Sequence, residues 1–384
     1  MEKLNFIDKT KSTDARGRAF KRLAFSSLLL SSIVSVVASQ ANVAAIITSI
    51  TPDSGPIAGS TEITISGTDL IPNETDYIQS GLQLHLDARN NTGTGTHDNS
   101  ATTWKNLVSG GADCTVVGGT WSDNSIKLDG TPQDYVRCGL YKFDYPTFEV
   151  VAKTLSLRGG FEQHIISNIE NSGMVILINP SNNLQFSAWI SGGWKRVYPT
   201  LASTNILVKY LTMSSRYDGA EQAFSINGEW WRNTQTGSLA YQATTPVVLG
   251  GNPTISGNVQ LDQGYNGQIC SARIYNRALT DAEVLHNQVV DFYRCGAGEN
   301  PMTVTLNNAD GPATCNVTEI ASDGSYIKCT TTAHMAGVVD VTVDNGINSV
   351  TLNDTFNYVD SSQLNPTNPN IPSAPNTGAK RRFI

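Results

Sequence analysis

Carboxylates that alternate along one strand are the first residues in this sequence that could do chemistry. A Glu-x-Asp-x-Glu strand would place a nucleophile and an acid/base on one face, as glycoside hydrolysis requires. The sequence has one Glu-x-Asp pair, Glu74 and Asp76, and Ile78 and Gln79 stand where a further acid would be needed. No Gly-x-Ser-x-Gly nucleophile elbow occurs. We therefore predict that the chain is not an enzyme.

Aromatic side chains offer a different chemistry, because sugar rings stack on exposed aromatic faces beside hydrogen-bonding groups. In the expected strand 183–190, alternation assigns Leu184, Phe186, Ala188 and Ile190 to the core. Trp189 then lies on the opposite face with Gln185 and Ser187. These residues predict a binding surface rather than a catalytic one.

Two neighbouring hairpin strands extend this aromatic set. After the turn at Gly192-Gly193, alternation places Trp194, Arg196 and Tyr198 on a shared face. The Asn227-Gly228 turn favours a two-residue hairpin, which pairs Trp231 with Phe224 and leaves Trp230 facing outward. We predict Trp189, Trp194, Tyr198 and Trp230 as ligand-binding residues, and Trp104 and Trp121 as core residues.

Asp and Cys residues suggest a metal and crosslinks. Calcium binds carboxylates and turn carbonyls, and Asp129, Asp134 and Asp218 stand in expected loops, so Ca²⁺ is the one cofactor to consider; each Asp could equally serve only its turn. The six cysteines permit three disulfides and fifteen pairings. We expect Cys315 to pair with Cys329 across the turn at Asp323-Gly324. No spacing typical of zinc ligands occurs.

The charge distribution argues against nucleic acid as a partner. The whole chain has a formal charge of −7. Without residues 1–41 and the basic residues Lys380, Arg381 and Arg382, 16 basic residues face 30 acidic ones, giving about −14. Such a surface repels polyanions.

Both ends of the chain resemble export and attachment signals. A basic segment at 1–22 precedes an apolar run at 23–38 and small residues at 38–41, which predicts a secretory signal or an N-terminal anchor. Residues 361–378 are rich in Pro, Asn and Ser and predict a disordered tail. Membrane or cell-wall attachment is expected only through these ends, and we predict a secreted or cell-surface location.

Between the ends, the sequence has the pattern of an all-β protein. Short alternating segments are separated by Asp-Gly, Asn-Gly and Gly-Gly turns. The exception is 280–288, where Thr280 and Glu283 form a capping-box pattern that predicts a short helix.

The central part of the chain resembles a concanavalin A-like, laminin-G-type jelly roll of bacterial surface proteins. The matching segments include Trp104-Lys105-Asn106-Leu107, Lys127-Leu128-Asp129-Gly130, Tyr265-Asn266-Gly267-Gln268-Ile269 and Arg273-Ile274-Tyr275-Asn276-Arg277-Ala278-Leu279-Thr280. The resemblance covers about 77–297. It implies two packed antiparallel sheets that bind carbohydrate or protein at a concave face or loop rim.

The flanking segments resemble two halves of one IPT/TIG immunoglobulin-like domain. The first half contains Ile50-Thr51-Pro52-Asp53-Ser54-Gly55 and the strand Glu62–Gly67, and the second contains the Cys315 and Cys329 strands and Gly337–Val343. We predict a signal or anchor at 1–41, an IPT/TIG domain at 42–76 and 298–359, an inserted jelly roll at 77–297, and a tail at 360–384. The fold class is thus an all-β jelly roll within a split β-sandwich.

Together these features predict an exported adhesion protein that recognises a glycan or an extracellular protein. The alternatives are a structural stalk without a ligand and a secreted carbohydrate-active enzyme. The segment Ala374-Pro375-Asn376-Thr377-Gly378 resembles the LPxTG sortase motif, with Ala replacing Leu and no apolar span before the basic residues. Attachment through this motif is an open alternative.

Overall fold

The computed structural model describes residues 44–360, except 123, 201–202, 255–258 and 261. The predicted signal at 1–41 and the sortase-like motif lie outside the described residues. Within the described ranges the strands form three sheets, and one α-helix is present. No helix there is long and apolar enough to cross a membrane.

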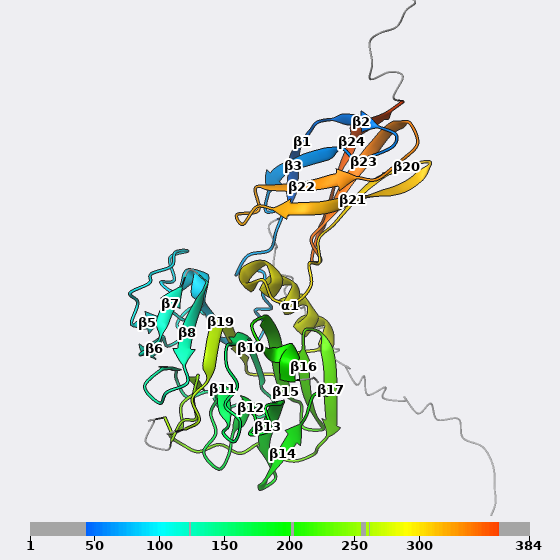
Figure 1. The fold of residues 1–384 in the computed structure, drawn as a ribbon. Helices are drawn as coiled ribbons and strands as arrows, with labels where there is room; N and C mark the ends of the chain where they lie inside the picture. The colour runs from blue at the N-terminus through cyan, green and yellow to red at the C-terminus, as the bar shows by residue number, and fades with distance from the viewer. Residues whose placement is uncertain (1–43, 123, 201–202, 255–258, 261, 361–384) are drawn as a thin grey trace, which may run out of the picture. The chain divides into compact units, whose positions relative to one another are not determined.

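The first sheet is built from both ends of the described chain (Figure 1). Its order is β1-β3-β22-β21-β20-β23-β24-β2. The strands are β1 (Ile46–Thr51), β2 (Ser54–Pro56), β3 (Glu62–Thr68), β20 (Thr303–Asn308), β21 (Gly311–Ile320), β22 (Tyr326–Thr331), β23 (Gly337–Asp344) and β24 (Ser349–Val359). To form such a sheet, the chain must leave this domain after β3 and return to it at β20.

Strand pairing and packing join the two ends into one sandwich. Ile63 pairs with Cys329, which is disulfide-bonded to Cys315. Ile63 and Val341 are both fully buried in the same hydrophobic cluster. Gly59 has φ +76°, and a Cβ there would lie 2.5 Å from the carbonyl carbon of Thr332, so only glycine allows this close approach. The predicted split-sandwich fold class is confirmed.

The chain between β3 and β20 forms two further sheets packed face to face. The β19 sheet has the order β17-β16-β15-β10-β19-β8-β7, with β4 paired to β19. Its strands are β4 (Leu82–Asp87), β7 (Thr120–Ser122), β8 (Ser125–Asp129), β10 (Thr147–Thr154), β15 (Tyr210–Tyr217), β16 (Glu221–Ile226), β17 (Glu229–Thr234) and β19 (Asn266–Tyr275).

The second of these sheets, the β13 sheet, has the order β14-β13-β12-β11-β18-β9-β6-β5. Its strands are β5 (Thr103–Trp104), β6 (Cys114–Val117), β9 (Tyr135–Arg137), β11 (Gln163–Ser167), β12 (Met174–Ile178), β13 (Leu184–Ile190), β14 (Gly193–Val197) and β18 (Val248–Leu249). Short 3₁₀ helices occur at Ala88–Asn90 and Ser203–Ile206. Alternating side chains of the two sheets fill one core, which includes the edge-to-face pair Trp104 and Trp121.

The single α-helix, α1 (Asp281–Cys295), is longer than the predicted 280–288. Its start agrees with the prediction, because Thr280 caps the helix and Glu283 completes the capping box. Its end is set by Gly296, which has φ +68° and donates to the Phe292 carbonyl. The segment after 288 contains Val, Phe and Tyr, which have weak helix propensity, and tertiary contacts compensate for this.

Those contacts are a buried ionic network on the face of the β19 sheet that points away from the core. The Arg273 guanidinium donates to Glu149 Oε2 at 2.9 Å and to both Asp291 carboxylate oxygens at 2.8 and 2.9 Å. Asn287 Nδ2 donates to the same Glu149 oxygen at 2.8 Å. Burial raises the pKa of Glu149 and Asp291, while the adjacent Arg273 charge opposes this shift. The network ties β10 and β19 to α1.

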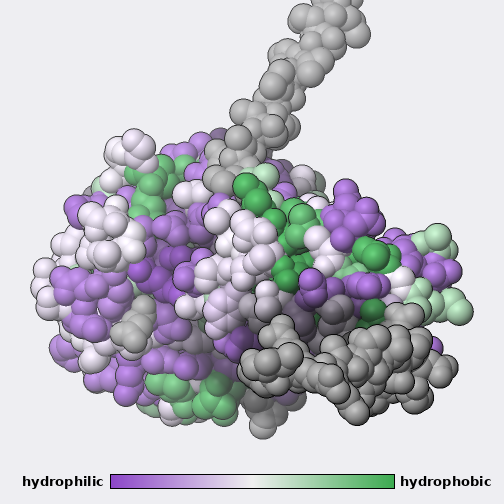
Figure 2. All heavy atoms as spheres, turned by 90° about the horizontal axis from the view of Figure 1, so that it is seen from above, coloured by the Kyte–Doolittle hydropathy of each residue, from purple (hydrophilic) through white to green (hydrophobic). Residues whose placement is uncertain are grey.

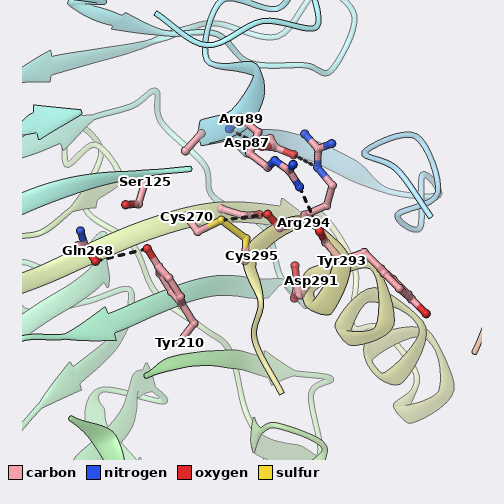
Figure 3. Close-up of a disulfide and its surroundings, with 12 residues drawn as sticks. Asp87, Arg89, Ser125, Tyr210, Gln268, Cys270, Asp291, Tyr293, Arg294 and Cys295 are labelled. Atoms are coloured by element: carbon pink, nitrogen blue, oxygen red, sulfur yellow. Dashed lines mark hydrogen bonds and ion pairs between the residues drawn. A yellow bond between two sulfur atoms is a disulfide. The ribbon is translucent and has the colours of Figure 1, made fainter. Parts of the chain in front are cut away.

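A disulfide fixes the end of α1 to the same sheet (Figure 3). Cys270 lies at a register shift in the β10–β19 pairing, where Val151 pairs with Ser271 and Ala152 with Ile269. The extra residue of this bulge allows Cys270 to bond to Cys295. Figure 3 also shows Arg294 reaching Asp87, and Arg294 Nε lies 2.7 Å from Asp87 Oδ2.

The same helix holds the segment by which the chain enters the insert. Tyr77 Oη donates to Asp291 Oδ1 at 2.8 Å, and the Ile78 amide donates to Asn287 Oδ1 at 2.9 Å. Arg294 also forms an ion pair with Glu74 at 3.1 Å. The entry segment and the exit helix are therefore bound to each other.

Replacing Arg273 with Met should destabilise the jelly roll by about 3–5 kcal/mol, because the carboxylates of Glu149 and Asp291 would remain buried without their cation. All six tryptophans lie within 104–231, so urea unfolding followed by tryptophan fluorescence reports this domain. The matched control is Arg277→Met, which removes a half-exposed pair with Glu283 and should cost about 1 kcal/mol or less. Equal losses for both variants would contradict the assigned role of the network.

His85 should make the stability of the jelly roll depend on pH. Burial, together with the charges of Arg273 and Arg294, lowers its pKa from 6.5 to about 3. Between pH 6.5 and pH 3 the unfolded chain therefore binds a proton at His85 that the folded chain excludes. The contribution of His85 to the free energy of unfolding is full above pH 6.5 and decreases as the pH falls towards 3. Relative to His85→Gln, the wild-type unfolding free energy should fall by about 1.4 kcal/mol per pH unit below about pH 6. Parallel pH profiles of the two proteins would refute this.

Candidate ligand-binding site

The hairpin of β13 and β14 presents a mixed aromatic and polar face on the side of the β13 sheet away from the core. Leu184, Phe186, Ala188 and Ile190 are core residues. Ser187 pairs with Arg196 and Trp189 with Trp194, so these four side chains share the opposite face. The two indole rings meet edge to face with centroids 5.2 Å apart. Alternation in the sequence predicted the outward direction of Trp189, but the turn is at Ser191-Gly192 and not at the expected Gly192-Gly193, and this register produces the pairing of Trp189 with Trp194.

This face contains a small cavity, which we call the Trp194 pocket. Its volume is about 120 Å³. An apolar group at its base, Ile169, Val175 and Leu177, packs against Trp194. The lining is completed by Glu162, Gln185, Ser187 and Arg196. The pocket thus combines an aromatic ring with a carboxylate, a guanidinium, an amide and a hydroxyl.

The polar groups at the pocket are partly ordered by their neighbours. Gln185 Nε2 donates to Ser187 Oγ at 2.6 Å. His164 Nε2 lies 3.0 Å from Glu162 Oε2, and the His164 side chain is fully buried. The hydrogen bond from His164 lowers the pKa of Glu162, and the charges of His164 and Arg196 lower it further. Burial raises this pKa but does not outweigh the other causes. Glu162 is therefore held as a carboxylate at neutral pH.

Arg196 is the charged group at this pocket that is available to a ligand. Its side chain is exposed, and it forms no ion pair or side-chain hydrogen bond with any described residue. A free guanidinium donates to hydroxyl, carbonyl or carboxylate oxygens. Together with the Glu162 carboxylate, it gives the pocket one donor group and one acceptor group for a polar ligand.

Three of the predicted binding residues do not line this pocket. Trp189 contacts the Trp194 ring but is not part of the lining. Tyr198 follows β14, is 52% exposed and does not line the pocket. Trp230 pairs with Ser225 and so does face away from the core, but it packs against Leu82, Tyr275, Leu279 and Val284. The guanidinium carbons of Arg216 and Arg232 each lie 4.6 Å from its ring centroid. Trp230 is half-buried by these contacts, and its role as a ligand-binding residue stays a prediction.

The three aspartates considered for calcium are not brought together. Asp129 Oδ1 accepts from the Thr131 amide, and Asp134 Oδ2 accepts from the Asp129 amide, within one loop. Asp129 pairs with Asn266 at the start of β19. Asp218 follows β15 and caps its own turn, near the end of β19, about 30 Å away along the strand. No cluster of three His, Cys, Asp or Glu suited to a metal occurs among the described residues.

The structure forms three disulfides, Cys114–Cys138, Cys270–Cys295 and Cys315–Cys329. The third is the pairing that the sequence led us to expect. Sequence reasoning missed Glu162 and the apolar group of Ile169, Val175 and Leu177. In Met174–Ile178 the sequence does not show which side chains face the core, because all five residues are apolar and no polar residue alternates with them. Only pairing with β13 shows which of them face the pocket.

Comparison with known families identifies both modules of the chain. Residues 145–285 match the family model described as the Concanavalin A-like lectin/glucanases superfamily. Residues 45–145 match the IPT/TIG domain. The chain therefore contains a concanavalin A-like domain and an IPT/TIG domain. The strands that complete the IPT/TIG sheet, β20 to β24, lie outside both matched ranges.

Solved structures with a similar fold include both enzymes and binding domains. The Trypanosoma rangeli sialidase in complex with 2,3-difluorosialic acid is 12% identical, with a TM-score of 0.40, over 54% of this chain and 32% of the sialidase chain. The botulinum neurotoxin type G receptor binding domain is 12% identical, with a TM-score of 0.43, over 71% of this chain and 74% of that domain. No curated protein matches the sequence. At these identities the likeness concerns the fold alone.

The expectation that the chain is not an enzyme is corrected by this comparison. The similar structures include several sialidases, one of them a mutant described as displaying trans-sialidase activity. The chain spans about a third of the length of these sialidase chains. The family model matched at 145–285 is itself described as covering both lectins and glucanases, so the missing Glu-x-Asp-x-Glu strand does not exclude an enzyme.

Proposed function

We propose that this chain is an exported surface protein that binds a glycan or an extracellular protein through the Trp194 pocket. The observation that carries the proposal is the pocket itself, where an aromatic ring, a free guanidinium and an ordered carboxylate adjoin. Sugars are bound by such combinations, because a ring face stacks on the indole while hydroxyls pair with charged and amide groups. The volume of about 120 Å³ suits one terminal group of a larger ligand.

The location and organisation proposed for the chain follow from the same features. Three disulfides favour an oxidising compartment, in keeping with the signal-like sequence at 1–41. We propose the boundaries 42–76 and 298–359 for the IPT/TIG domain and 77–297 for the jelly roll, with attachment through the N-terminal segment or the tail at 360–384. The IPT/TIG domain then displays the jelly roll.

A glycan array probed with the full chain, with and without Ca²⁺, tests this function. Trp194→Ala should weaken binding to any glycan that is captured by about tenfold, the loss expected for one stacked ring. The control is Tyr145→Ala, because Tyr145 is a half-exposed aromatic residue outside the pocket, and this variant should bind as the wild type does.

Two outcomes would contradict the proposal. If Trp194→Ala and Tyr145→Ala bind the captured glycan equally well, the pocket is not the site. If neither the glycan array nor a panel of extracellular proteins yields binding, the chain is better described as a stalk without a ligand.

A further inference from the structure

A second cavity lies on the other sheet of the jelly roll, and we call it the Lys209 pocket. Its volume is about 510 Å³, within the usual range of small-molecule sites. Its walls come from the start of β15, the turn at Asn227, α1 and the segment 296–301. None of its lining residues lines the Trp194 pocket, so a ligand here is additional to the proposed glycan.

The walls of this pocket are preformed. The Thr212 amide donates to Asn227 Oδ1, and the Asn227 amide donates to the Thr212 carbonyl, both at 3.0 Å. A Cβ on Gly228 would lie 3.1 Å from Leu285 and 3.2 Å from Gln288, so α1 packs closely over the turn. The Cys270–Cys295 bond holds the segment that begins at Gly296 (Figure 3). A rigid cavity binds a ligand without a large ordering cost.

Three polar groups of the pocket have no partner among the described residues, and two of them carry opposite charges. Lys209 and Glu299 both line the cavity, and neither forms an ion pair with any described residue. Thr212 is only 3% exposed, and its Oγ1 has no hydrogen-bond partner. A buried hydroxyl without a partner is unfavourable.

The remaining wall is apolar. Leu285 and Val289 lie four residues apart on one face of α1, and Ala297 and Pro301 belong to the returning segment. Leu285 is 46% exposed, although the large hydrophobic residues around it are buried or half-buried. On the face drawn in Figure 2, hydrophobic residues form small separate groups among hydrophilic ones, as on an ordinary protein surface.

We propose that the Lys209 pocket binds a small zwitterion with an apolar side chain, such as a free amino acid. The ligand carboxylate pairs with Lys209 and the ammonium with Glu299, while the apolar side chain packs on Leu285 and Val289. A ligand with one charge would leave either Lys209 or Glu299 unpaired, so complementarity favours the molecule that carries both.

Calorimetry on the full chain with three probes tests this proposal. L-Leucine carries both charges, N-acetyl-L-leucine lacks the ammonium, and L-leucinamide lacks the carboxylate. Leucine should bind at least about tenfold more tightly than either blocked probe. Lys209→Gln should remove the preference for leucine over leucinamide, and Glu299→Gln the preference over N-acetyl-leucine. Both residues are exposed, so both variants should fold, which tryptophan-detected urea unfolding checks.

The outcomes separate this site from the proposed glycan site. Trp194→Ala should bind leucine as the wild type does, so the failure of one proposal leaves the other intact. No binding of leucine at millimolar concentration, or equal binding of all three probes, would overturn the zwitterion site. Leucine binding that persists unchanged in both Lys209→Gln and Glu299→Gln would also overturn it.

Discussion

The buried contact between Arg273 and Asp291 is the interaction on which the rest of this structure depends. A domain can be inserted between two strands of another sandwich only if its first and last residues lie close together. Here Asp291 accepts from Arg273 of β19 and from Tyr77 of the entry segment. One carboxylate thus joins the sheet, the exit helix and the entry segment. The return of the chain to β20 beside β21 and β23 becomes possible because of that junction.

This junction is polar for a physical reason. The face of the β19 sheet under α1 carries Glu149, Ser214 and Arg273, and these groups are buried once the helix covers them. Each charge must then be paired, because an isolated buried charge costs several kcal/mol. Paired charges also fix geometry, since the bidentate contact of Arg273 with Asp291 allows little rotation of the helix. The disulfide at Cys295 adds a covalent restraint at the end of the same helix.

The sequence predicted which side chains share a face within one strand, because this depends on local periodicity. It did not predict contacts between segments that lie far apart in the sequence. Alternation correctly placed Trp189 on the face away from the core. The expected turn at Gly192-Gly193 would have paired Trp189 with Arg196, but the observed turn is Ser191-Gly192, and this register pairs Trp189 with Trp194. Hairpin register gave the right face for Trp230, but it contains no information about the helix that covers that face. Asp129 and Asp218 looked alike as turn residues, and only the β19 pairing shows that they lie at opposite ends of a strand. The bulge at Cys270 has no local signal that distinguishes it from a regular strand.

The position of α1 also explains why the two cavities differ in character. On the β13 sheet the Trp194 pocket is formed by strands and the segments that flank β11, so it is small, and its specificity must come from a few side chains such as Arg196. On the β19 sheet the helix and the returning segment stand above the strands, and the space between them is about four times larger. Lys209 and Glu299 line that space from separate segments and form no ion pair with each other. The contacts that return the chain to its first domain therefore also create a preformed cavity lined by two opposite charges.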